Sequence, residues 1–160
     1  MKDTEKLADE IRIAIETLSE IRERFDDFMG RNRRGVEDAL LFGRYVELYY
    51  GRIETVFLHV KNMFGNDVET EAWHKGLLYA MTRDTFYRRR VISDSTYHAL
   101  DELRGFRHFV RYNYRLDNYD WDRMELIAAM LRKSHETIVP EFGNFIEYLE
   151  SLERREDSDA

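Results

Sequence analysis

Residues 36–64 read VEDALLFGRYVELYYGRIETVFLHVKNMF, and they give the clearest indication of the fold class. Apolar side chains recur in it at three- and four-residue steps, which is the period of one face of an α-helix. Gly65 and Asn66 follow, and both are typical of a helix C-cap. The pattern therefore predicts one long helix over 36–64 with a broad apolar stripe, which comprises Leu40, Leu41, Tyr45, Leu48, Tyr49, Ile53, Phe57, Val60 and Phe64.

The same period recurs on both sides of this stretch. It predicts helices over about 6–29 and 71–86, and a further helix from Thr96 to Tyr112 or Tyr114, capped by Ser93 or Asp94. A last helix begins after Asp120, and Pro140 is expected to break or restart it because proline lacks an N–H. No β-type alternation longer than four residues competes. We therefore expect an all-α, up-and-down bundle of four to five main helices.

Length and composition narrow the class of protein. The 160 residues suit one helical domain, expected over 1–152, with a polar, disordered tail over 153–160. The absence of cysteine excludes disulfides, thiolate metal sites and cysteine nucleophiles. We expect no signal peptide, and the sequence holds no apolar stretch of about 20 residues. We expect a cytoplasmic protein that does not enter the membrane.

The chain is acidic overall, but arginine greatly outnumbers lysine among its basic residues. The net charge of −7 argues against long-range attraction to nucleic acid. Among the basic residues, however, 20 are arginine and 5 are lysine. Arginine is typical of planar, bidentate contacts to phosphate or carboxylate, so the excess predicts a local anion site or internal salt bridges.

The predicted helix that begins at Thr96 has one strongly basic face. At about 100° per residue, its basic side chains share a face opposite Leu103, Phe106 and Val110. Because like charges at this spacing repel, an anion is expected opposite them. Three kinds fit: carboxylates of neighbouring helices (Glu37, Asp38, Glu47 or Glu54), an acidic partner protein, or RNA phosphate with His108 or a tyrosine transferring a proton. The basic face comprises Arg104, Arg107, His108, Arg111 and Arg115.

Other polar clusters predict neither a metal nor a cofactor. Asp117, Asp120 and Asp122 lack EF-hand spacing, and Asp120 suits a helix N-cap. The remaining histidines show no ligand pairing, and no glycine-rich nucleotide loop is present. The arginines at 88–90 and those at 31, 33 and 34 are either solvated or extend a phosphate track. The remaining histidines are His59, His74, His98 and His135.

Residues 104–117, RGFRHFVRYNYRLD, resemble the signature of the HEPN superfamily and of its HepT-like ribonuclease toxins. That signature has Arg, four residues, His, one residue and Tyr. Two further segments are similar to the same branch, YYGRIETVF at 49–57 and AWHKGLL at 72–78 with Met81 behind it. The resemblance covers about residues 36–150. The matching positions in the first segment are Phe106, Arg107, His108, Arg111, Tyr114, Leu116 and Asp117.

The resemblance implies a function and partners. It implies the toxin of a toxin–antitoxin pair, a metal-independent endoribonuclease acting on RNA, and a homodimer whose motif helices face each other across a cleft. It also implies a nucleotidyltransferase antitoxin that transfers AMP to the motif tyrosine, here Tyr114. Arg107 would be the motif arginine.

Position 112 departs from the family pattern, because Tyr112 stands where the motif histidine falls. A phenol with a pKa of about 10 does not exchange a proton at neutral pH as imidazole does. Three functions therefore stay open. In the first, Arg107 is catalytic, His108 or Tyr112 transfers the proton, and Arg104, Arg111 and Arg115 bind phosphate. In the second, the protein is a scaffold that binds RNA or the nucleotidyltransferase without cleavage. In the third, it is a helical interaction domain whose arginines pair with its own carboxylates.

Overall fold

The computed structural model describes residues 2–65 and 73–159, and the side chains of Trp73 and His74 lie outside that description. The described residues form five α-helices and one short 3₁₀ helix, with no strand among them. The predicted all-α bundle is confirmed. The helices are α1 (Asp3–Arg31), α2 (Val36–Phe64), α3 (Trp73–Ala80), α4 (Asp94–Tyr112) and α5 (Trp121–Asp159), with the 3₁₀ helix at Leu116–Asn118.

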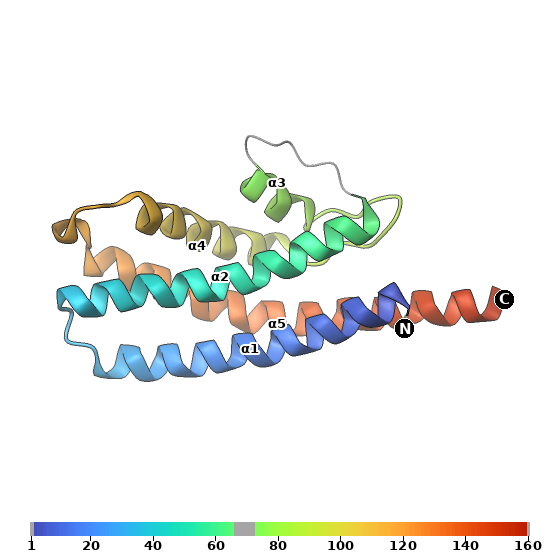
Figure 1. The fold of residues 1–160 in the computed structure, drawn as a ribbon, viewed down its shortest axis with the longest axis horizontal. Helices are drawn as coiled ribbons and strands as arrows, with labels where there is room; N and C mark the ends of the chain where they lie inside the picture. The colour runs from blue at the N-terminus through green and yellow to red at the C-terminus, as the bar shows by residue number, and fades with distance from the viewer. Residues whose placement is uncertain (1, 66–72, 160) are drawn as a thin grey trace.

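Four long helices run alternately up and down (Figure 1). Helix α1 packs against α2 and α5, and α4 packs against the same two helices, so the four close a ring around one core. The short helix α3 lies outside this ring and contacts α2 and α4. This arrangement leaves one long side of α4 facing outward.

Aromatic side chains from three helices meet in the core. The ring of Phe42 makes edge contacts with Phe25 of α1 and Phe106 of α4, with both centroid distances at 5.5 Å. All three side chains are buried. Fully burying one such side chain contributes about 1.5–3 kcal/mol, so this aromatic chain fixes α2 between α1 and α4.

Helices α2 and α4 approach closely at a glycine. A Cβ atom added to Gly43 would lie 3.1 Å from Cγ2 of Val110. Valine has one strongly preferred rotamer in a helix, so Val110 has little freedom to yield. The missing side chain of Gly43 therefore lets the two helices come close enough for polar side chains to pair across them.

Most helix boundaries follow their caps. Helix α2 has the predicted bounds and ends at Gly65, whose φ of 72° is the left-handed conformation that glycine adopts readily. Ser93 caps α4, because its hydroxyl accepts the Thr96 N–H at 3.3 Å. The helix predicted over 71–86 ends earlier, at Ala80. The guanidinium of Arg88 donates to the carbonyls of Ala80 and Arg83, which turns the chain into a loop instead.

Pro140 does not end the last helix, contrary to the sequence prediction. Helix α5 runs through it and continues over 153–159, the segment predicted as a disordered tail. Buried side chains lie on both sides of the proline, including Ile138 and Phe142. Their packing keeps the helix in register and offsets the backbone hydrogen bond that proline cannot make.

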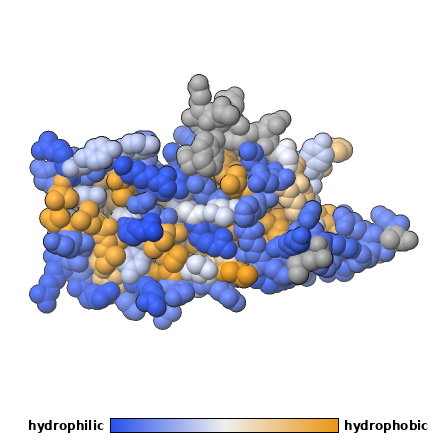
Figure 2. All heavy atoms as spheres, viewed as in Figure 1, coloured by the Kyte–Doolittle hydropathy of each residue, from blue (hydrophilic) through white to orange (hydrophobic). Residues whose placement is uncertain are grey.

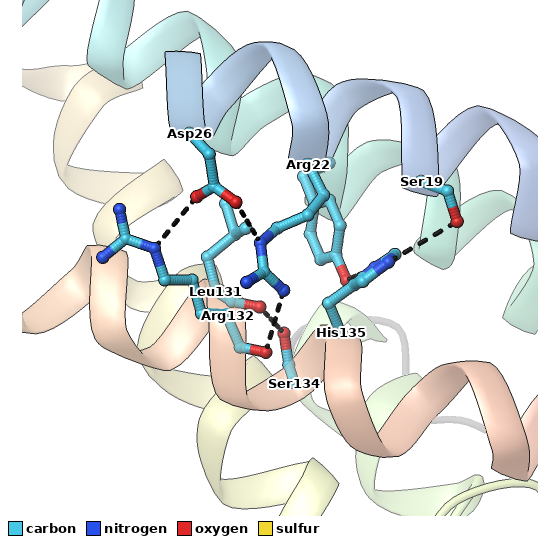
Figure 3. A network of polar contacts seen from close by, with 8 residues as sticks. Ser19, Arg22, Asp26, Leu131, Arg132, Ser134 and His135 are labelled. Carbon is cyan, nitrogen blue, oxygen red and sulfur yellow. Dashed lines mark hydrogen bonds and ion pairs between the residues drawn. The ribbon is translucent and has the colours of Figure 1, made fainter. Parts of the chain in front are cut away.

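A polar network joins α1 to α5 beside the aromatic core (Figure 3). Asp26 accepts from Arg22 at 2.9 Å and from Arg132 at 3.0 Å. Further along, the Nδ1 atom of His135 lies 3.0 Å from the hydroxyl of Tyr49. Burial, aided by the nearby Arg22 cation, lowers the pKa of His135, so its neutral form is favoured.

The surface mixes charged and apolar groups along the helices (Figure 2). None of the helices in the described part of the chain has an apolar stretch long enough to cross a membrane.

Candidate functional site

The outward side of α4 carries the candidate site. Side chains from two successive turns line a small pocket of about 70 Å³ there. Basic groups dominate the lining, and its aromatic member is the exposed Tyr112. The structure therefore brings together most of the basic face that the sequence predicts. The lining residues are Arg104, Arg107, His108, Arg111 and Tyr112.

Arg107 lies at the inner edge of this pocket and is almost fully buried, with 3% of its surface exposed. Its two terminal nitrogens donate to the two carboxylate oxygens of Glu54 on α2, at 3.1 and 3.0 Å. The guanidinium also lies 4.5 Å from the ring centroid of Tyr50. A bidentate ion pair and a cation–π contact thus hold the motif arginine between α2 and α4.

Tyr50 is buried beside this ion pair and supplies its aromatic face. Burial raises the pKa of Tyr50, and the nearby carboxylate of Glu54 raises it further. The phenol therefore stays neutral at any physiological pH. Tyr50 was missed among the predicted site residues, although it lies in the 49–57 segment that carries the family resemblance.

The two more exposed arginines also meet carboxylates of the same chain. Arg104 donates through Nε to Asp101 at 2.9 Å, and Arg111 lies 3.7 Å from Glu47. Two of the four carboxylates named from the sequence, Glu47 and Glu54, therefore face the basic side of α4. Each of the three arginines thus meets a carboxylate of its own chain, as expected where arginines pair internally. Asp101 was missed, since it lies three residues before Arg104 on the same helix and not on a neighbour.

His108 is exposed on the outer face of α4, one turn from Arg104 and Arg111. Its ring centroid lies 4.6 Å from that of Tyr112. Because His108 follows Arg107 by one residue, its side chain points about 100° away from the buried arginine. The imidazole therefore lines the pocket and is exposed to solvent.

Helix α4 ends at Tyr112, so Tyr114 and Arg115 do not extend its face as a continued helix would. The side chain of Asn113 causes the ending: its amide donates to the Arg115 carbonyl at 2.9 Å, and its oxygen accepts the Arg115 N–H at 3.2 Å. Such local bonds compete with helix continuation. Arg115 pairs with Asp117 at 3.2 Å, and Tyr114 is 89% exposed.

The other polar clusters have structural roles where the structure describes them. Asp120 caps α5 by accepting the Asp122 N–H at 3.0 Å. Over residues 2–65 and 73–159, no group of three or more possible metal ligands gathers. The nitrogen Nδ1 of His59 lies 2.5 Å from a carboxylate oxygen of Glu10, whereas the side chain of His74 is outside the described residues.

The fold and the motif helix together define a HEPN-type protein: an up-and-down helical bundle whose α4 carries the motif arginine against α2. A protein-family model described as HepT-like protein matches residues 41–149. The match spans α2 to α5, and the chain therefore belongs to the HepT-like family. No curated protein and no solved structure matches the chain.

The buried pair gives a direct test of the part that Arg107 plays in stability. Replacing Glu54 by glutamine removes the carboxylate charge opposite a buried guanidinium, so we expect Glu54→Gln to lower the free energy of unfolding by about 3 kcal/mol. The matched control is Glu47→Gln, which affects the more exposed pair and should cost less than about 1 kcal/mol. Urea denaturation followed by circular dichroism measures both. Equal, small losses would show that the Arg107–Glu54 pair does not hold α2 to α4.

Proposed function

We propose that this protein is the toxin of a toxin–antitoxin pair and cleaves RNA, without a metal ion, at the outer face of α4. The observation that carries the proposal is the pocket in which Arg104, His108 and Arg111 converge beside the motif arginine. Guanidinium groups stabilise the charge that develops on a phosphate under attack, and an imidazole transfers protons at neutral pH.

The residues that line the pocket have different roles in this reaction. Arg104 and Arg111 bind the scissile phosphate, exchanging their partly exposed carboxylate contacts for it, which costs little because such pairs contribute about 1 kcal/mol or less. His108 takes the proton of the attacking 2′-hydroxyl as that oxygen bonds to phosphorus and the bond to the 5′-oxygen breaks. Arg107 is a positioning residue, since Glu54 and Tyr50 hold it in place.

The proposed enzyme is a homodimer. Strand cleavage needs a base and an acid, and a second copy of the same face supplies a second imidazole for the leaving 5′-oxygen. Helix α2 exposes large apolar side chains beside this face, and Leu48 directly follows the residue that pairs with Arg111. Their exposure supports a self-association surface. These side chains are Leu40, Leu41 and Leu48.

The catalytic part is tested with RNA and the protein prepared free of antitoxin, in the presence of a metal chelator. We expect cleavage, and we expect His108→Ala to slow it by about 10²-fold or more. His98→Ala is the matched control, because His98 is exposed on the same helix outside the pocket, and it should cleave at the wild-type rate. Intact RNA after prolonged incubation with the wild-type protein would contradict the nuclease proposal.

A specific observation favours a second candidate function, a scaffold that binds RNA or the nucleotidyltransferase without cutting. Tyr112 occupies the motif histidine position, and the motif arginine is paired with Glu54. If the protein is such a scaffold, we expect the wild type to leave RNA intact. Tyr112→His should then gain cleavage, because it restores an imidazole one turn from His108. Tyr112→Phe is the control and should gain none. If the histidine variant stays inactive, the site has diverged beyond this single residue.

We further propose that the antitoxin regulates the protein by transferring AMP to Tyr114. The phenol oxygen attacks the α-phosphorus of ATP, pyrophosphate leaves, and the phenolic proton passes to a base of the transferase or to solvent. The 89% exposure of Tyr114 supports this, since a transferase must surround its acceptor. Arg115 lies next to the adduct and would attract its phosphate charge.

Co-expression with the nucleotidyltransferase tests this transfer. Intact-mass spectrometry should find one adenylyl group on the wild type and none on Tyr114→Phe. Tyr112→Phe is the matched control, because Tyr112 is also exposed and lies two residues away, and it should still carry the group. An adduct that persists on Tyr114→Phe would place the acceptor elsewhere.

A further inference from the structure

The loop between α3 and α4 presents two aromatic side chains to solvent without a packing reason. Phe86 is 96% exposed and Tyr87 is 66% exposed. Their rings contact each other edge to face, with centroids 5.3 Å apart. Burying a phenylalanine ring stabilises a fold by about 1.5–3 kcal/mol. The exposed Phe86 contributes none of this free energy. A role in binding explains such exposure where folding does not.

The loop is held in this shape from below. Arg88 is buried, and its guanidinium donates at 3.1 Å to three backbone carbonyls, those of Ala80, Arg83 and Arg89. At the base of the loop, the Val91 and Ile92 N–H groups donate to the Met81 carbonyl at 2.8 and 3.1 Å. The aromatic tip is therefore preorganised, which reduces the entropy that binding would cost.

The hydrogen bonds of Thr85 then shape the tip itself. Its hydroxyl accepts the N–H groups of Tyr87 and Arg88 at 3.2 and 3.1 Å, and its own N–H donates to the Arg88 carbonyl at 2.8 Å. These bonds close a tight turn around Phe86 and Tyr87. Both rings are thus kept outside the bundle.

Positive charge surrounds the two rings. Residues 82–90 hold four arginines against one aspartate, a local net charge of +3 in a chain whose net charge is −7. An open hollow of about 560 Å³ lies beside the rings and continues onto the end of α5. Arg155 lines it from α5, and Arg89 lies over the Tyr148 ring at 5.2 Å. The loop therefore combines cations with aromatic faces.

We propose that this loop binds single-stranded RNA, with bases stacked on Phe86 and Tyr87 and phosphates held by Arg89, Arg90 and Arg155. Every base offers a π-face, so stacking tolerates any sequence, and the arginines supply the attraction to the backbone. The inference rests on the proposed function for the choice of RNA over DNA. It adds a strand-binding surface that shares no lining residue with the α4 pocket.

The test measures the affinity of the full-length protein for a fluorescent, unstructured RNA of about 12 nucleotides. All variants carry His108→Ala, so that cleavage does not remove the probe. Phe86→Ala and Tyr87→Ala should each raise Kd at least about fivefold. Leu126→Ala, which truncates an apolar side chain of 68% exposure on α5, is the matched control and should leave Kd unchanged. Phe86→Trp should retain binding, because a larger ring stacks at least as well.

Two further measurements separate stacking from charge. Arg89→Gln and Arg90→Gln should each lower the slope of log K against log salt by about 0.7, whereas Phe86→Ala should leave that slope unchanged. A duplex of the same sequence should bind more weakly than the single strand, because its bases already stack on one another. If duplex and single strand bind with equal affinity, and if Phe86→Ala lowers both affinities equally, the stacking proposal is overturned.

The remaining outcomes distinguish this surface from the α4 site. If Phe86→Ala and Tyr87→Ala bind RNA with the same Kd as the protein without these substitutions, the loop proposal is overturned. This holds even where the wild-type protein cleaves RNA. Loss of RNA binding in these two variants upholds it even where the wild-type protein leaves RNA intact and the nuclease proposal falls. Unchanged RNA binding together with lost binding to the nucleotidyltransferase would make the loop a protein-docking surface and overturn the RNA proposal.

Discussion

The buried contact of Arg107 with Glu54 and Tyr50 sets the orientation of α4, and the candidate site depends on it. Two ions taken out of water need each other, because either one left alone would carry a desolvation cost of several kcal/mol. The pair is possible because α2 and α4 approach closely where Gly43 faces Val110. Once Arg107 is fixed inward, helix geometry directs His108 outward.

This arrangement gives the family motif a structural role. The segments at 49–57 and 104–117, which carry the resemblance to HepT-like proteins, are the two that meet through Glu54, Tyr50 and Arg107. Arg107, buried in this way, shapes the pocket. Arg104 and Arg111 beside it are more exposed and pair with Asp101 and Glu47.

Periodicity predicted the bounds of α2 and the faces of α1 and α4 closely, because burial of an apolar stripe is a local property of the sequence. Leu40, Leu41 and Leu48 of the stripe predicted for α2 are nevertheless exposed. Periodicity failed where contacts between residues far apart in the sequence determine the local structure. Pro140 stays inside α5 because side chains on both flanks pack into the core, and Arg88 ends α3 from eight residues away. A helical wheel likewise placed Arg107 with the exposed cations, since its partner Glu54 lies 53 residues earlier.

The acidic net charge of −7 and the two basic surfaces are compatible because electrostatic forces act over short distances in salt. At physiological ionic strength the screening length is about 8 Å, so carboxylates on the far side of the bundle do not cancel the field at the α4 pocket or at the loop. Like charges on α4 are offset locally, by Asp101, Glu47 and Glu54, and by the negative end of the helix dipole near Arg111. A ligand that reaches either surface therefore meets a local positive field on an acidic protein, which favours anions bound at close range over polyanions attracted from afar.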